Sequence, residues 1–150
     1  PAESKMSLGW REWVALPDLD ISRIKAKIDT GARTSCLHTF RTEPYTENGE
    51  RRVRFWVHPV QNDLHQVVEC DARVLDERNV SDSGGHKEMR LVIETTLLIG
   101  GQKWPIEMTL TNRDSMRFRM LLGRTAMSGR SVIYPEASYL AGKPALRTEK

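Results

Sequence analysis

Apolar and polar residues alternate along much of this chain, which is the pattern of strands with one buried face. Ile24, Ala26 and Ile28 alternate with Lys25 and Lys27, and a period of two residues is typical of a half-buried strand. Comparable β-rich runs predict strands at residues 10–16, 24–28, 36–38, 53–57, 67–75, 91–99, 104–110 and 118–122. No segment keeps an apolar period of 3.6 residues. Many short strands with frequent turns predict an all-β barrel or sandwich.

The turn residues between these runs divide the chain further. Asn48-Gly49 is a strong hairpin signal, and Gly100-Gly101 predicts a second tight turn. Residues 81–86 combine two glycines with small polar residues, which predicts a mobile hairpin tip or loop. Residues 125–128 are expected to form one or two helical turns before Gly129.

Composition indicates one compact domain without a membrane segment. The chain has 150 residues, of which 39% are hydrophobic and 29% charged, enough for one buried core. No run reaches the roughly 18 apolar residues of a membrane span, and residues 1–8 lack the apolar segment of a signal peptide. Cys36 and Cys70 are too few for a disulfide framework, so we expect buried thiols in a reducing compartment. The expected location is cytoplasmic.

The charge does not indicate a nucleic-acid partner. The net charge is +3 and the pI about 9.1, but the basic residues are dispersed and no arginine-rich helix or aromatic platform accompanies them. We therefore expect a solvated basic surface, which could still favour an acidic partner.

Asp29-Thr30-Gly31-Ala32 is the strongest candidate for chemistry, together with Leu121-Leu122-Gly123-Arg124 far along the chain. Each string ends an apolar strand at a glycine. Two carboxylates that share a proton can hydrolyse an amide, because one activates water while its protonated twin polarises the carbonyl. Gly31 allows a sharp turn behind Asp29, the Thr30 hydroxyl can fix the opposite copy of the loop, and small Ala32 leaves room for substrate.

One such triplet in the chain supplies only one carboxylate. Asp82-Ser83-Gly84 has the residue types of such a triplet, but it lies in a polar stretch and no apolar strand precedes it. A catalytic pair therefore requires a two-fold homodimer that places Asp29 of each copy across the axis.

These strings make the chain similar to a known family. Residues 97–127 resemble the C-terminal half of a retropepsin, and residues 9–142 resemble a bacterial family named for ATP-dependent zinc proteases. The motifs that carry this resemblance lie at residues 26–35, 57–59, 82–86, 109–114 and 120–127. The resemblance implies a closed barrel of the retropepsin type with a short C-terminal helical turn. It also implies a disordered or extended tail over residues 1–8, a domain over 9–142 and a C-terminal tail over 143–150.

The same resemblance implies an aspartic-type peptidase with Asp29, Thr30 and Gly31 at its catalytic centre. Residues 76–90 would form the flap, with Gly84 and Gly85 against the substrate. Members of this family often accompany an ATP-grasp ligase that adds glutamates to a ribosomal protein. Trimming of such acidic tails is the activity that the resemblance implies.

One position departs from the retroviral pattern. Arg33 stands where retroviral enzymes carry an acidic residue that pairs with the later arginine, here Arg124. Either the two arginines orient an acidic substrate, or a carboxylate neutralises them. Glu94, Glu107 and Asp114 are the candidates for that carboxylate.

The sequence contains no motif for the zinc or the ATP that the family name mentions. The chain has no H-E-x-x-H string and no P-loop. Cys36 and His38, two apart on a strand, are the strongest pair of metal-ligand types. We expect no metal and no cofactor. Two alternatives stay open at this stage: a non-catalytic peptide-binding module with the same fold, and a zinc-dependent protease.

Overall fold

The computed structural model describes residues 5–81, 84–112 and 117–144. Its strands are β1 (Met6–Leu8), β2 (Arg11–Leu16), β3 (Ile21–Ile28), β4 (Ser35–His38), β5 (Arg41–Glu47), β6 (Glu50–Val57), β7 (Val68–Ser81), β8 (Lys87–Ile99), β9 (Gln102–Thr111), β10 (Met120–Leu122) and β11 (Ser131–Ile133). A 3-10 turn, η1 (Pro17–Leu19), and one short helix, α1 (Arg124–Met127), complete the described elements. The fold is therefore mostly β, as predicted.

The predicted turns form where the backbone needs them. Asn48 and Gly49 adopt φ values of 54° and 78° between β5 and β6, the left-handed conformation that a two-residue hairpin turn requires. Gly100 and Gly101 adopt φ values of 59° and 80° between β8 and β9. Both hairpin predictions are confirmed.

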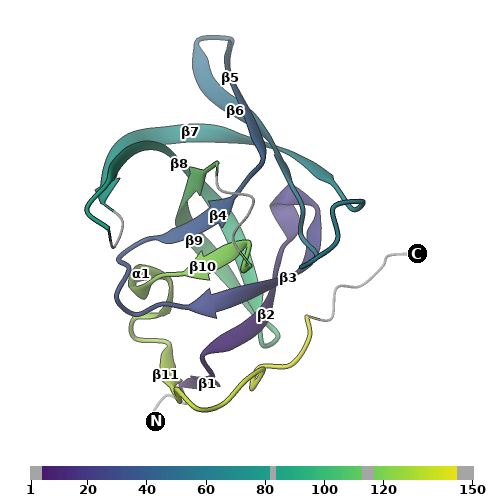
Figure 1. The fold of residues 1–150 in the computed structure, drawn as a ribbon, viewed down its shortest axis with the longest axis vertical. Coiled ribbons are helices and arrows are strands. Elements are labelled where there is room, and N and C mark those ends of the chain that lie inside the picture. Colours follow the sequence, from purple (N-terminus) through teal and green to yellow (C-terminus); the bar gives the residue numbers. More distant parts are fainter. Residues whose placement is uncertain (1–4, 82–83, 113–116, 145–150) are drawn as a thin grey trace.

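The larger sheet has the strand order β2-β3-β10-β4-β9-β8-β7-β6-β5. Strands β2 and β8 also pair, through Ala15 and Leu98, so that six strands form a ring. This closure rests on a single residue pair, and the structure is thus a ring of strands rather than the continuous closed barrel of the prediction. Strands β5 and β6 extend beyond the ring as an arm (Figure 1).

The core is built from the inward residues of these strands. In β3, Ile24, Ala26 and Ile28 are buried while Arg23 and Lys27 are exposed, which reproduces the alternation of the sequence. The largest fully buried side chains include Phe55, Leu37, Ile93, Met108 and Met120. Burying such side chains stabilises the fold by roughly 1.5–3 kcal/mol each.

A small parallel ribbon joins the two ends of the described chain. Strand β1 pairs with β11, with Met6 opposite Ser131 and Leu8 opposite Ile133. Strand β1 thus begins within residues 1–8, the segment predicted as a tail.

Glu12 fastens the segment that follows β11. Its side chain is fully buried and accepts hydrogen bonds from the backbone N–H groups of Gly9 at 2.6 Å, Leu140 at 2.9 Å and Ala141 at 3.0 Å. A buried carboxylate needs such partners. Glu12 therefore attaches the C-terminal segment to β2.

The hairpin of β7 and β8 is longer than its sequence suggests. The pattern predicted strands that end at Leu75 and resume at Leu91, but β7 continues to Ser81 and β8 begins at Lys87. Residues in this extension are mostly exposed, so no buried face revealed it. Among the described residues, no helix has the length and apolar character needed to cross a membrane.

Candidate active site

Asp29 directly follows β3 and is held by the backbone around it. Its N–H donates to the carbonyl oxygen of Leu122 at 2.9 Å. Its Oδ1 accepts a hydrogen bond from the N–H of Gly31 at 3.0 Å, and its carbonyl oxygen accepts one from the N–H of Ala32 at 3.2 Å. These contacts form a tight turn of the kind that Asp and Gly favour. The carboxylate thereby takes a fixed position on a partly exposed loop.

The two strings singled out in the sequence meet in space. Strands β3 and β10 pair in parallel, with Ile28 opposite Leu122, so the residues that follow each strand lie at the same edge of the sheet. We call residues 29–34 the D-T-G loop. The N–H groups of Arg124 and Thr125 donate to the carbonyl oxygens of Ala32 and Arg33 at 2.8 and 3.0 Å. The start of α1 therefore supports the D-T-G loop.

The close contact between the D-T-G loop and the residues before α1 requires a glycine at position 123. A Cβ atom at this position would lie 2.5 Å from the carbonyl carbon of Thr34 and 2.8 Å from the nitrogen of Ser35. Its N–H donates to the Ser35 Oγ at 2.9 Å, inside the protein. Sequence reasoning did not single out Ser35, because a bond across 88 residues leaves no local signal.

The structure places Arg33 and Arg124 in different surroundings. Nη1 of Arg124 donates to the carbonyl oxygen of Thr30 at 3.0 Å. Arg33 lines a cavity of about 210 Å³ together with Arg78, Glu94 and Glu107. Within the described ranges, neither Arg33 nor Arg124 forms an ion pair.

Arg78 holds one of the carboxylates that were candidates for pairing with Arg33. Its Nη2 lies 3.0 Å from Glu107 Oε1, and its Nε lies 3.1 Å from Asp76 Oδ2. The backbone N–H of Glu77 and the Arg78 guanidinium lower the pKa of Asp76. Asp114, the third candidate, lies outside the described residues.

The predicted flap reaches the neighbourhood of the D-T-G loop at its base. Arg78 of β7 lines the same small cavity as Arg33, and the tip of the β7–β8 hairpin lies on the same side of the molecule as the end of β3 (Figure 1). Gly84 and Gly85 are exposed at this tip. Asp82 and Ser83 lie outside the described residues.

The cysteines and histidines do not assemble into a metal centre in the part of the chain that the structure describes. No group of three or more His, Cys, Asp or Glu side chains suitable for a metal occurs there. Both cysteines are buried and free of disulfides, as predicted. Cys36 Sγ accepts a hydrogen bond from Arg90 Nη1 at 3.5 Å, and burial raises the pKa of Cys70 to about 12.

Comparison with known families agrees with this arrangement. The RimB-like family, described as retropepsin-like aspartic endopeptidase RimB, matches residues 7–144. The chain belongs to the RimB-like family. The resemblance seen in the sequence is thereby confirmed.

Curated relatives of this RimB-like chain are longer proteins. One named "Probable alpha-L-glutamate ligase" from Shewanella pealeana is 43% identical over 142 residues, which are 95% of this chain and 31% of that protein. Another of the same name, from Parasynechococcus marenigrum, is 46% identical over 138 residues, covering 92% of this chain and 30% of that protein. The chain thus spans less than a third of the length of these relatives.

A solved structure shares the fold of this RimB-like chain. A Legionella pneumophila protein of unknown function superposes with a TM-score of 0.77 and 22% sequence identity. The superposition covers 92% of this chain and 99% of that one. At this identity the likeness establishes the common fold alone.

Proposed function

We propose that this RimB-like chain is an aspartic-type peptide hydrolase that acts as a homodimer in the cytoplasm. The observation that carries the proposal is the position of Asp29, fixed by Gly31 and supported by the backbone of Arg124 and Thr125. A carboxylate on a braced, partly exposed loop is suited to meet its counterpart across a two-fold axis. Two buried cysteines outside any disulfide support an intracellular reducing location.

The chemistry follows from the proximity of two like charges. Two carboxylates a few ångströms apart do not both ionise, so the pair holds one proton. The ionised Asp29 takes a proton from water, and the resulting hydroxide adds to the peptide carbonyl. The protonated Asp29 of the second copy donates to the carbonyl oxygen. Transfer of a proton to the amide nitrogen then releases the two peptide products.

The proposed substrate is an acidic, glutamate-rich peptide. Arg33 belongs to the D-T-G loop and Arg124 contacts it, and neither has a carboxylate partner in the described part of the chain. Guanidinium groups bind carboxylates through two parallel hydrogen bonds. The names of the curated relatives, alpha-L-glutamate ligases, support a connection with glutamate chains.

The substitution Asp29→Asn tests the mechanism. We expect it to abolish hydrolysis of poly-α-glutamate without lowering the melting temperature, because the amide cannot accept the proton of water. The assay is run with and without a metal chelator, and with a neutral peptide of equal length. Full turnover by Asp29→Asn, or loss of wild-type turnover upon chelation, would contradict the aspartic mechanism.

Sedimentation under assay conditions tests the homodimer. We expect activity per chain to fall on dilution as the dimer dissociates, since each copy supplies one Asp29. A fully active monomer would refute the shared pair of carboxylates.

A further inference from the structure

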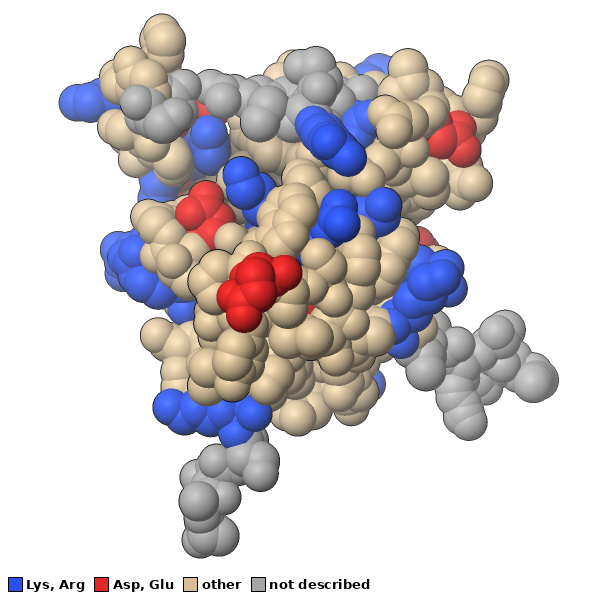
Figure 2. All heavy atoms as spheres, turned by 60° about the horizontal axis from the view of Figure 1, so that its bottom comes forward, with Lys and Arg blue, Asp and Glu red and all other residues tan. Residues whose placement is uncertain are grey.

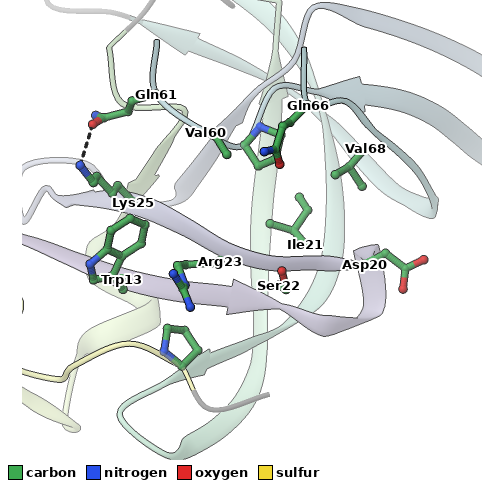
Figure 3. Close-up of a pocket in the computed structure, with 12 residues that line it drawn as sticks. Trp13, Asp20, Ile21, Ser22, Arg23, Lys25, Val60, Gln61, Gln66 and Val68 are labelled. Atoms are coloured by element: carbon green, nitrogen blue, oxygen red, sulfur yellow. Dashed lines mark hydrogen bonds between the residues drawn. The ribbon is translucent and has the colours of Figure 1, made fainter. Parts of the chain in front are cut away.

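The outer face of β2 and β3 forms the floor of a second, larger pocket. Its volume is about 610 Å³, and the loop that contains Gln61 and Gln66 forms a wall (Figure 3). Trp13, Arg23 and Lys25 project from the floor. We call this cavity the β3 pocket.

The polar groups of the β3 pocket leave its positive charges unneutralised. Lys25 Nζ donates to Gln61 Oε1 at 3.0 Å, and Gln61 Nε2 in turn donates to the carbonyl oxygen of Arg117 at 3.0 Å. The Arg23 guanidinium and Lys25 Nζ lie 5.7 and 5.2 Å from the centroid of the Trp13 ring. These partners are neutral, so they position the cations without cancelling their charge.

The β3 pocket also contains one carboxylate, which lies away from the cations. Asp20 lines the β3 pocket at the end opposite Trp13 (Figure 3). Lys143 Nζ lies 5.8 Å from the Trp13 ring centroid and adds a positive charge at the Trp13 end. That end is therefore the one suited to an anionic group.

The cations of β3 lack the carboxylate partners that half of the described arginines have. Basic side chains occur in several separate groups over the face shown in Figure 2. Among the residues that the structure describes, seven of fourteen arginines form ion pairs with carboxylates, namely Arg41, Arg51, Arg52, Arg54, Arg73, Arg78 and Arg90. Arg23, Lys25 and Lys27 form none with any residue that the structure describes. A row of cations without carboxylate partners beside a pocket is suited to an external anionic partner.

The same strand leads from the β3 pocket to the candidate active site. Arg23, Lys25 and Lys27 occupy every second position of β3, which is followed by Asp29. Alternate residues of a strand are about 6.6 Å apart, and alternate side chains of an extended peptide have the same spacing. The six-residue distance from Arg23 to Asp29 corresponds to about 20 Å.

We propose that Arg23, Lys25 and Lys27, with the β3 pocket, form an accessory site for the carboxylates of an acidic peptide whose cleaved bond lies at Asp29. This inference rests on the proposed function and extends it to substrate length. The glutamate carboxylates of the peptide would meet these cations. A peptide must then extend about six residues from the cleaved bond to use the whole site.

Equilibrium binding tests the accessory site without requiring hydrolysis. The probes are fluorescein-labelled twelve- and three-residue poly-α-glutamates, measured by anisotropy with the Asp29→Asn chain at low salt. We expect Lys25→Gln to raise the Kd of the twelve-residue peptide about three-fold, as for a partly exposed ion pair. The double substitution with Arg23→Gln should raise it about ten-fold, and the Kd of the three-residue peptide should not change.

Matched controls separate the site from general charge. Lys103→Gln removes an equal charge from an exposed position of β9 and should leave the Kd unchanged, while Lys25→Arg should retain binding. Equal weakening by Lys25→Gln and Lys103→Gln would overturn the accessory site. Equally tight binding of a twelve-residue oligothymidylate through the same residues would overturn its assignment to acidic peptides.

Failure of the accessory site and failure of the proposed function give different results. If the wild-type chain cleaves long acidic peptides but Lys25→Gln changes neither Kd nor KM, the accessory site is wrong and the hydrolase stands. If the peptide binds through Arg23 and Lys25 but Asp29→Asn does not affect turnover, the accessory site stands and the aspartic mechanism is wrong.

Discussion

Substitution of Gly123 by alanine should displace the loop that carries Asp29. The added Cβ would lie 2.5 Å from the carbonyl carbon of Thr34, and ordinary contact begins at 3.4 Å, so one backbone segment has to move by about 0.9 Å. Such crowding costs about 1–3 kcal/mol. Weakening of the hydrogen bond from Gly123 to Ser35 adds about 1 kcal/mol.

The expected total is about 2–4 kcal/mol, which lowers the melting temperature of a domain this size by about 4–16 °C. A displacement near 1 Å at a catalytic group also reduces turnover, by about 100-fold. Thermal unfolding and kcat/KM on an acidic peptide measure the two effects.

Two companion variants identify the cause of any loss. Gly101→Ala makes the same change at a glycine with open space around it and a φ of 80°, so it should cost about 1–2 kcal/mol of backbone strain and leave kcat unchanged. Ser35→Ala removes only the hydrogen bond to Gly123. Wild-type stability and activity in Gly123→Ala would refute the reasoning.

Three further predictions concern single side chains. Glu12→Gln should destabilise the chain by about 1.5–3 kcal/mol in urea unfolding, because the amide cannot accept from all three N–H groups that Glu12 holds; unchanged stability would contradict this. Burial raises the pKa of the Cys70 thiol to about 12 from its ordinary value of 9.0, so stability should fall as pH rises above 9, and Cys70→Ala should abolish that component. Arg33→Ala should lower kcat/KM for glutamate-rich peptides about ten- to hundred-fold, or about 1.5–3 kcal/mol, relative to neutral ones; equal discrimination by both proteins would exclude Arg33 from recognition.

The sequence predicted most of the strands that have one buried face. The alternation around Ile24 and Ile28 indicated β3, and Asn48-Gly49 indicated the hairpin of β5 and β6. The extensions of β7 and β8 were missed because a hairpin exposed on both faces has no apolar period. The last long strand was predicted from Phe118, but β10 begins at Met120.

The residues of the candidate site could be predicted from the sequence, but the contacts between them could not. Asp29 and the Gly123-Arg124 string were recognisable as strand ends, whereas the bond between Gly123 and Ser35 depends on segments that only the fold brings together. Trp13 lines the β3 pocket. Its role depends on cations of the neighbouring strand, which a linear pattern does not pair with it.

The position of Glu12 makes the stability of the fold depend on residues beyond its last strand. The last strand ends at Ile133, and a chain cut there would keep every strand of the ring. It would nevertheless lose the N–H groups of Leu140 and Ala141, two of the three that hold this buried carboxylate. An uncompensated buried charge costs several kcal/mol, comparable to the whole stability of many domains. A chain that ends at Ile133 should therefore be less stable than one that extends to Ala141, beyond the last element of secondary structure.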